Sequence, residues 1–374
     1  MGQEGLRLIV SGGGTGGHLF PGIAVAETFL AYAPANKVLF IGTERHTDMR
    51  VLAGRNFQTA SISSQGLKGK TVGARIKSMC QLPFSLIAAR KLIVRFKPDL
   101  VLGVGGYVTG PVLLAARLMG IATCIQEQNS VPGLANRIIG KFVDRIFISF
   151  PQSKRYFPRG KCMLSGNPVR KELLDLIRLP EKKDDARKTL LVLGGSLGAH
   201  KVNILVVEAL ERVKVKLSDT FRVIHQTGKD DEKKVSQEYS RIGLDAEVAA
   251  FFDDMAYVYK EADVIISRAG ATTLAEMTVL AKPMILIPYP YAADDHQRKN
   301  GQFLVEEGVA RMFVQDDLDP KELAEEIMEL FSNGEKRKRM AEAARRVGKP
   351  DAVDVIVKEI VTLASGSRTL NLKP

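Results

Sequence analysis

The sequence predicts an α/β protein with two domains, each built on a parallel β-sheet. Its 374 residues are enough for two domains of roughly 150 residues each. Short apolar runs alternate with helix-length segments, and continuous runs such as Val264-Ile265-Ile266 are typical of strands covered on both faces. A strand, glycine-turn and helix pattern at Ile9–His18 returns at Leu191–His200, with a histidine at the matching offset. This internal repeat favours two tandem Rossmann-like domains with ligands at the carboxyl ends of the strands.

The first predicted domain covers residues 1–166 and alternates strands with helical segments such as Pro21–Ala31. Apolar runs predict six strands, at Arg7–Ser11, Lys37–Gly42, Leu100–Val104, Ala122–Gln126, Arg145–Ser149 and Cys162–Ser165.

The second predicted domain covers residues 167–349, after a boundary near Gly166-Asn167-Pro168. Its helical segments include Thr272–Leu280. Its strands are predicted at Thr189–Leu193, Arg222–His225, Glu247–Phe251, Asp263–Ser267, Met284–Pro288 and Ala310–Val314. The following segment, 350–365, predicts an amphipathic helix with Val353, Ile356, Ile360 and Leu363 on one face, and 366–374 predicts a frayed tail.

The composition excludes several protein classes. With 45% hydrophobic and 26% charged residues, the chain is neither disordered, collagen-like nor a coiled coil overall. The three cysteines, Cys80, Cys124 and Cys162, form no CxxC pair, which argues against a disulfide scaffold or zinc site and fits a reducing cytosol. The start of the sequence lacks a signal-peptide or myristoylation pattern, and no uncharged apolar run reaches the roughly 18 residues of a membrane span.

The formal net charge of +12 is unevenly distributed. Residues 1–165 carry 21 basic and 7 acidic residues, a net charge of +14, whereas residues 166–374 have a net charge of −2. Between Asp48 and Asp99 there are ten basic residues and no acidic one. Such a stretch attracts polyanions, which leaves nucleic acid, anionic lipid and a phosphorylated substrate open.

Glycine-rich loops follow three predicted strands. They are Gly12-x-Gly14-x-x-Gly17, Gly103–Tyr107 and Gly194-Gly195-Ser196. Glycine lets the backbone approach a phosphate, and the next helix offers free N–H groups to it. NAD binding is disfavoured because no acidic residue stands about 20 residues after the first loop. The three loops together predict two phosphorylated ligands, one for each domain.

Several polar residues near these loops have two open interpretations. His18 is either a helix-end histidine or a general base. Glu276 is either a carboxylate favourable to the helix dipole or a bidentate acceptor for ribose hydroxyls. The cluster Asp294–Asn300 is either an exposed loop or a sugar-binding one.

The Asp317-Leu318-Asp319 sequence resembles a cation-binding pair, but Pro320 suits the first helical position and Asp319 the cap. It therefore predicts a helix start, and no metal is expected.

The acid-free segment Gln81–Lys97 predicts a helix that starts at Pro83 and ends before Pro98. Part of it is expected to bury an apolar face as a crossover helix. Its exposed basic residues with apolar neighbours favour contact with an anionic membrane. Nucleic acid is not expected, because the chain has no tryptophan and no apparent base-stacking module.

Taken together, these motifs resemble the bacterial peptidoglycan glycosyltransferases of the MurG type, in glycosyltransferase family 28. The resemblance spans nearly the whole chain and is carried by nine segments: GGTGGHLFPG (13–22), GLKGK (66–70), KPDLVLGVGGYVTGP (97–111), EQN (127–129), GNPVR (166–170), GGSLGA (194–199), FFDDM (251–255), SRAGATTLAE (267–276) and DDHQRKN (294–300). It implies a GT-B fold, in which two Rossmann-like domains face a cleft and the C-terminal helix returns to the first domain. The implied reaction is the inverting transfer of GlcNAc from UDP-GlcNAc to the MurNAc 4-hydroxyl of lipid I, which yields lipid II.

The resemblance also implies roles for individual residues. His18 is the expected base, with Glu127 as the next candidate. The substrate-binding set would comprise Thr15, Gly16, Gly17, Asn129, Arg170, Ser196, Phe252, Arg268, Ala271, Thr272, Thr273, Leu274, Ala275, Glu276, His296 and Gln297. Within it, Glu276 would bind the ribose, the Phe252 backbone the uracil, and Arg268 would assist at the diphosphate. The acceptor diphosphate would meet Gly14, Gly105, Gly106 and Tyr107.

The implied enzyme needs no cofactor and lies peripherally on the cytoplasmic face of the bacterial inner membrane. Other cell-wall synthesis proteins are candidate partners, with consequences for cell shape and division. Leu197 stands where the family usually has Gln, which leaves any side-chain role at 197 open. The alternatives are a nucleotide-sugar sensor, an NAD-dependent oxidoreductase, and a transferase with another acceptor such as a glycolipid.

Overall fold

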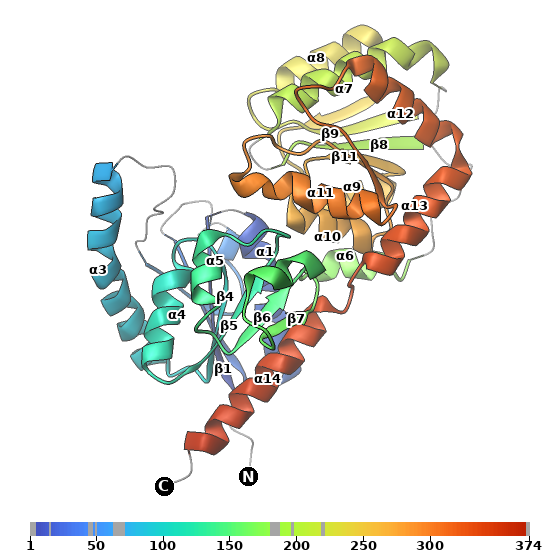
Figure 1. Cartoon of the computed structure of the whole chain (residues 1–374). Coiled ribbons are helices and arrows are strands. Elements are labelled where there is room, and N and C mark those ends of the chain that lie inside the picture. Colours follow the sequence, from blue (N-terminus) through green and yellow to red (C-terminus); the bar gives the residue numbers. More distant parts are fainter. Residues whose placement is uncertain are drawn as a thin grey trace. The chain divides into compact units, whose positions relative to one another are not determined.

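The chain forms two compact units in a computed structural model, the first comprising residues 1–170 with 350–374 and the second residues 171–349 (Figure 1). The structure describes residues 5–14, 16–43, 48, 51–62, 72–179, 188–195, 198–217 and 221–371, with the backbone alone at 72–81 and 367–371.

The first unit is built on a seven-stranded, fully parallel sheet with the order β3-β2-β1-β4-β5-β6-β7. The order reverses between β1 and β4, so the helices that follow these two strands lie on opposite faces of the sheet, which favours a binding position at its carboxyl edge. The strands are β1 (Arg7–Gly12), β2 (Lys37–Gly42), β3 (Gln58–Ser61), β4 (Leu100–Gly105), β5 (Ala122–Glu127), β6 (Arg145–Ile148) and β7 (Cys162–Leu164).

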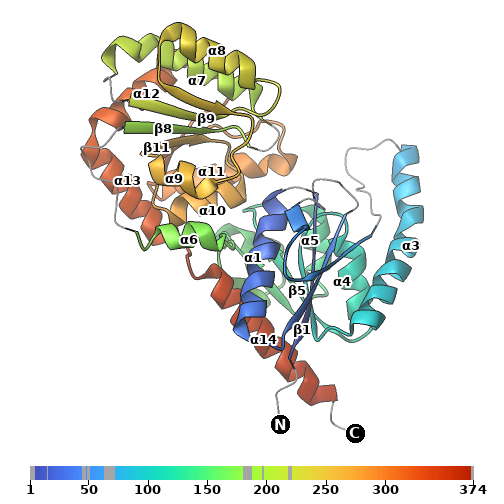
Figure 2. The ribbon, with the colours of Figure 1, turned by 180° about the vertical axis from the view of Figure 1, so that it is seen from behind.

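Helices cover both faces of this sheet, which is why its central strands β1, β4 and β5 are buried along almost their whole length. On one face α1 lies beside α14, and the buried side chains of both helices form one core with β1 and β4 (Figure 2). On the other face α3 and α4 form the second core. The helices are α1 (Gly16–Tyr32), α3 (Val72–Phe96), α4 (Thr109–Leu118), α5 (Leu134–Ile139), the 3₁₀ helix η1 (Pro151–Tyr156) and α14 (Ala352–Asn371).

The second unit has a six-stranded parallel sheet with the order β10-β9-β8-β11-β12-β13, which reverses between β8 and β11. Its strands are β8 (Lys188–Leu193), β9 (Phe221–Gln226), β10 (Ala246–Ala249), β11 (Val264–Ser267), β12 (Met284–Leu286) and β13 (Ala310–Met312). Its helices are α6 (Lys171–Leu176), α7 (His200–Val213), η2 (Lys214–Lys216), α8 (Glu232–Ile242), α9 (Met255–Glu261), α10 (Ala271–Val279), η3 (Ala293–Asp295), α11 (His296–Glu306), α12 (Pro320–Ser332) and α13 (Gly334–Val347).

The predicted α/β class with parallel sheets is confirmed, and each predicted strand lies within two residues of an observed one. The strand β3 was missed, because its sequence, Gln-Thr-Ala-Ser, is polar and its side chains are largely exposed. The tail predicted from residue 366 is helical to Asn371, as no proline interrupts α14 there.

The predicted helix start at Pro83 is wrong, because α3 begins at Val72 and passes through the proline. A proline inside a helix removes one backbone hydrogen bond and costs about 3 kcal/mol. Burial of Ala89, Ile93 and Phe96 in the second core offsets that cost. Of the helices in the described ranges, none is both long enough and apolar enough to cross a membrane.

Candidate active site

The strand order of the first sheet reverses between β1 and β4, and we call this position the switch point of the unit. Here the loops after β1 and β4 pack backbone against backbone. The Gly13 N–H donates to the Gly105 carbonyl oxygen at 3.3 Å. Gly106 has φ +87°, and a Cβ there would lie 2.2 Å from the Gly13 carbonyl oxygen. Only glycine fits at position 106, so the two predicted phosphate loops form one continuous surface.

His18 stands on the first turn of α1 beside this surface. A Cβ at Gly105 would lie 2.5 Å from the His18 Nδ1, so the ring rests directly on the second glycine loop. The Nδ1 atom lies 3.2 Å from Gln128 Oε1, and Gln128 Nε2 donates to the Val104 carbonyl oxygen at 2.7 Å. This second bond fixes the orientation of the Gln128 amide. Because Oε1 can only accept, Nδ1 carries the hydrogen and Nε2 is the basic nitrogen of the neutral ring.

The Glu127 carboxylate is buried at the end of β5 and holds the chain that follows. Its Oε1 accepts from the Asn129 backbone N–H at 2.9 Å, and its Oε2 accepts from Asn136 Nδ2 at 2.7 Å. Burial raises the pKa of Glu127 against the opposing effect of these hydrogen bonds. One oxygen therefore orients Asn129 and the other holds Asn136, whereas His18 is only half-buried.

The remaining predicted residues of the first unit are spread over its carboxyl edge. The Gly14 N–H donates to Asp48 Oδ2 at 2.9 Å, so this conformation does not offer it to a phosphate. Gly17 is exposed and Tyr107 is 49% exposed at the start of the chain that leads into α4. The Arg170 guanidinium stacks on the Phe20 ring, 4.7 Å from its centroid, and so belongs to the first unit. Thr15 lies outside the described residues.

In the second unit, the glycine loop after β8 is held by the turn after β9. The Gly194 N–H donates to the Gln226 carbonyl oxygen at 3.1 Å. Gly198 has φ +77°, and a Cβ there would lie 2.7 Å from the Thr227 carbonyl oxygen. The loop leads directly into α7, as the sequence pattern predicts. Ser196 and Leu197 lie outside the described residues.

The segment predicted to bind the nucleotide forms the first turns of α10. The N-cap is Gly270, which has no side chain to cap the helix, and the first amides of the helix are those of Ala271, Thr272 and Thr273. Leu274 is buried in this turn and Ala275 is half-buried. Glu276 is only 5% exposed, and its Oε2 accepts from the hydroxyl of the buried Tyr259 at 2.9 Å. The Glu276 carboxylate is thus fixed in orientation by the protein.

Arg268 connects the ends of two strands. Its Nη1 donates to the carbonyl oxygens of Ile287 and Pro288 at 3.0 and 3.1 Å, and its Nη2 donates to Gln315 Oε1 at 2.6 Å. Desolvation lowers its pKa from the ordinary arginine value. Through these bonds Arg268 supports the chain after β12. They occupy N–H groups of the guanidinium that the sequence suggests for a diphosphate.

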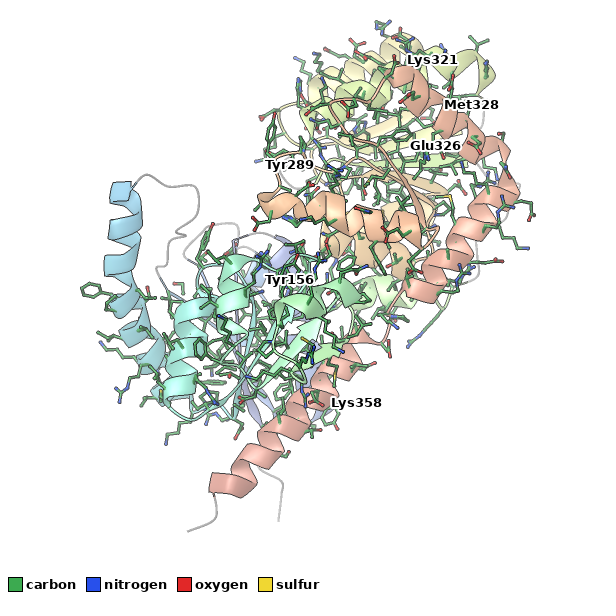
Figure 3. The ribbon with its side chains drawn as sticks, in the orientation of Figure 1. Tyr156, Tyr289, Lys321, Glu326, Met328 and Lys358 are labelled. Atoms are coloured by element: carbon green, nitrogen blue, oxygen red, sulfur yellow. The ribbon has the colours of Figure 1, made fainter. Side chains whose placement is uncertain are left out.

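The polar cluster that follows β12 is a strained loop. Asp294 and Asp295 both have positive φ, at +56° and +55°, a left-handed conformation that few non-glycine residues adopt and that aspartate adopts more readily than most. His296 Nδ1 donates to the Ala293 carbonyl oxygen at 2.8 Å. Gln297 Oε1 accepts from the backbone N–H of Tyr289 at 2.9 Å (Tyr289 is labelled in Figure 3). Both side chains, at the start of α11, are thus hydrogen-bonded to the backbone of the preceding loop.

Asp319 caps α12 as predicted, since its side chain accepts from the Lys321 N–H and Pro320 is the first helical residue. Within the described ranges, no group of three or more His, Cys, Asp and Glu side chains is placed to hold a metal ion.

No role was predicted for Gln128 from the sequence, although roles were predicted for both of its neighbours in the EQN segment, Glu127 and Asn129. Gln226 was missed as well; its only sequence signal is its position at the carboxyl end of β9, next to the glycine of the following turn.

Residues 8–148 match the glycosyltransferase family 28 N-terminal domain, and residues 189–356 match the glycosyltransferase family 28 C-terminal domain. The chain belongs to glycosyltransferase family 28. It is 44% identical to the UDP-N-acetylglucosamine–N-acetylmuramyl-(pentapeptide) pyrophosphoryl-undecaprenol N-acetylglucosamine transferase of Geobacter sulfurreducens, over 95% of this chain and 98% of that one. It is 47% identical to the enzyme of the same name from Desulfotalea psychrophila, over 94% and 95% of the two chains.

Solved structures agree with the two-domain α/β fold. MurG from Acinetobacter baumannii superposes with a TM-score of 0.76 at 30% identity, over 96% of this chain and 99% of that chain. A UDP-GlcNAc 2-epimerase from Neisseria meningitidis shares the fold alone, with a TM-score of 0.68 at 15% identity, over 96% of this chain and 100% of that one. The chain is therefore a glycosyltransferase, and the predicted GT-B fold is confirmed.

Proposed function

We propose that this family 28 enzyme transfers GlcNAc from UDP-GlcNAc to the MurNAc 4-hydroxyl of undecaprenyl-pyrophosphoryl-MurNAc-pentapeptide, converting lipid I to lipid II. The observation that carries the proposal is 44% identity to a transferase of that name across 95% of the chain. A glycine loop at the switch point of each unit supports a phosphorylated ligand in each. The first unit would take the acceptor and the second the nucleotide donor.

The proposed reaction is a single displacement with inversion. The acceptor oxygen attacks C1 of the sugar, the bond from C1 to the β-phosphate oxygen breaks, and UDP leaves with the electron pair. His18 Nε2 takes the hydroxyl proton, because the Nδ1 hydrogen is held by Gln128. The engaged oxygens of Glu127 make that residue a support for Asn129 and Asn136.

The diphosphate groups would be stabilised by backbone N–H groups. For the donor, the N-termini of α7 and α10, which have no side-chain cap, are the candidates. For the acceptor, the amides of Gly106 and Tyr107, just before α4, are the candidates.

The deciding experiment is transfer of radiolabelled GlcNAc from UDP-GlcNAc to a short-chain lipid I analogue. Formation of a labelled disaccharide lipid supports the proposal, and its absence with an active acceptor contradicts it. A thermal shift with UDP-GlcNAc but none with NAD separates the transferase from an oxidoreductase. UDP-GlcNAc binding without transfer would instead indicate a sensor, and transfer to a different glycolipid would indicate another acceptor.

Replacing Glu276 by Gln should raise the KM for UDP-GlcNAc by about tenfold to a hundredfold and change kcat less, because a hydrogen bond to a charged acceptor is worth about 1.5–3 kcal/mol. The isosteric amide keeps the volume at this buried position. Steady-state kinetics with varied donor measure the effect. Glu322→Gln, at an exposed glutamate of α12, is the control. A donor KM equal to that of the control would reject ribose binding by Glu276.

We infer that the first unit also binds the cytoplasmic face of an anionic membrane. Phe84, Ile87 and Val94 lie on one face of α3 and are 73%, 54% and 48% exposed. Lys91 and Arg95 lie on the same face and are exposed. An exposed apolar stripe with basic neighbours supports shallow insertion beside acidic headgroups. Other cell-wall synthesis proteins would meet the enzyme at this membrane.

Reversing three basic residues of α3, as Arg90→Glu, Lys91→Glu and Arg95→Glu together, should weaken binding to anionic vesicles by at least about tenfold, since each basic residue contributes about 1 kcal/mol at such a surface. Vesicle co-sedimentation at two salt concentrations measures it. The control carries the same charge change on α13 of the second unit, as Lys338→Glu, Arg339→Glu and Arg346→Glu. Equal loss in both variants would point to net charge instead of a specific surface.

A further inference from the structure

Three buried amide side chains form a hydrogen-bonded chain at the carboxyl edge of the first sheet. Gln128, whose Oε1 contacts His18 Nδ1, donates through Nε2 to the side-chain oxygen of Gln126, near the end of β5. Gln126 Nε2 donates in turn to Asn167 Oδ1 at 3.1 Å. None of the three amide residues is more than 4% exposed. The contacts therefore lead through the protein interior from His18 to Asn167.

The direction of every bond in this amide chain follows from one backbone carbonyl. Gln128 Nε2 donates to the Val104 carbonyl oxygen, which can only accept, so Gln128 presents its Oε1 to His18. The Gln126 atom that faces Gln128 Nε2 must then be the oxygen, which leaves Gln126 Nε2 for Asn167. Each glutamine thus accepts on the side of His18 and donates on the side of Asn167. Hydrogen bonds aligned in this way polarise and strengthen one another.

The Gln126 amide is also held from the neighbouring strand, β6. Its Nε2 donates to the hydroxyl oxygen of Ser149 at 3.2 Å, and that hydroxyl donates to the Glu127 carbonyl oxygen at 3.1 Å. Both hydrogens of the amide are therefore used, one on Asn167 and one on Ser149. A buried polar network whose members are all satisfied favours a single arrangement.

Asn167 lies in the segment by which the chain leaves the first unit. This segment, 166–170, follows β7, and the second unit begins directly after it. It contacts α1 as well, because the Arg170 guanidinium stacks on the ring of Phe20, two residues after His18. The segment is thus joined to the helix that carries His18 through Arg170, and to the His18 ring through the amide chain.

We propose that Gln126 and Asn167 are positioning residues for the general base, an inference that rests on the proposed function and on His18 as its base. Asn167 holds the amide of Gln126, which holds the amide of Gln128. Gln128 in turn keeps the ring hydrogen on Nδ1, so that Nε2 takes the proton of the acceptor hydroxyl. The ring then becomes positively charged, and the aligned amides, whose oxygens point towards it, stabilise that charge.

The test is a double-mutant cycle on the GlcNAc transfer step, measured by rapid quench with both substrates saturating. Gln126→Met and Asn167→Leu remove the amides and keep similar side-chain sizes. Each should slow the step by about threefold to tenfold, the effect of one hydrogen bond. The steady-state KM for UDP-GlcNAc should change less than about twofold, because the proposed donor site lies in the second unit. In a His18→Ala background neither change should slow the step further, because both residues act through the ring.

Asn36→Leu is the matched control, since it removes another buried amide of the first unit. Asn36 Oδ1 accepts from the Leu6 N–H at 2.9 Å, and its Nδ2 donates to the Phe29 carbonyl oxygen at 2.8 Å. Asn36 directly precedes β2 and so lies at the amino edge of the sheet, away from His18. Its loss should lower the melting temperature, as the loss of Asn167 should, but leave the transfer step at the wild-type rate.

Three kinetic outcomes would each overturn the positioning role. They are losses that multiply in the His18→Ala background, a transfer rate within about threefold of wild type in both single variants, and an equal loss in Asn36→Leu. Failure of both single variants to fold while Asn36→Leu folds would also overturn it, because the amides would then serve the fold alone. In all these cases transfer by the wild-type chain leaves the proposed function standing. No transfer by wild type would overturn that function and the positioning role together.

Discussion

His18→Ala is expected to lower kcat by about 10²- to 10⁴-fold at saturating acceptor, with little change in the KM for UDP-GlcNAc. The ring rests on the second of the paired glycine loops of the first unit, whereas the Asp48 carboxylate at the first loop is already bonded to the Gly14 N–H and the Thr43 hydroxyl. Gln128 holds its Nδ1 hydrogen, which leaves Nε2 as the atom that takes a proton. Alanine removes this acceptor without adding volume.

Rapid-quench measurement of the transfer step checks this expectation, since product release can mask a loss in the chemical step. His200→Ala is the matched control, because His200 occupies the equivalent position after the second unit's glycine loop and its side chain is 66% exposed. A kcat within a factor of three of wild type would remove His18 from the mechanism. Glu127 would then be the residue to replace next.

A second variant separates a chemical role of His18 from a structural one. Gln128→Met removes the partner of Nδ1 but keeps the imidazole, so it should lower kcat by a smaller factor than His18→Ala. If His18 only filled space against Gly105, both variants would change thermal stability and kcat in proportion.

The sequence was most informative where a pattern is local. Glycines directly after apolar strands identified the loops at Gly12, Gly103 and Gly194, and all three lie at carboxyl ends of the described strands. Asp319 and Pro320 likewise identified the start of α12, because a cap depends on adjacent residues.

Contacts between distant residues were not predictable in this way. The His18–Gln128 contact joins positions 110 residues apart, and the Gln226–Phe252 contact joins positions 26 residues apart. Neither has a spacing that a helix or strand imposes, so both depend on how the strands are ordered in each sheet. Arg268 shows the converse: its sequence position suggested a ligand contact, but folding supplies it with carbonyl partners.

Gly106→Ala should lower kcat/KM on the order of 10²-fold, the scale expected when a catalytic loop moves by about 1 Å. The new Cβ would lie 2.2 Å from the Gly13 carbonyl oxygen, a backbone atom whose residue is itself bonded to Gly105. The two glycine loops must therefore separate, which moves the surface on which His18 rests. The positive φ adds about 1–2 kcal/mol of strain, so the melting temperature should fall as well.

Gly120→Ala isolates the effect of the clash, because Gly120 has a similar φ of +72° but its Cβ would have no neighbour within 4 Å. In both variants an alanine must adopt the left-handed backbone conformation, which lowers the stability of the fold. Only Gly106→Ala also forces the two glycine loops apart. Parallel measurement of kcat/KM and thermal unfolding should show comparable losses of stability from backbone strain but a loss of activity confined to Gly106→Ala. If the two variants lost activity equally, the close approach of Gly106 to Gly13 would have no part in catalysis. If Gly106→Ala alone lost activity, the packed pair of glycine loops would be a functional unit whose geometry His18 requires.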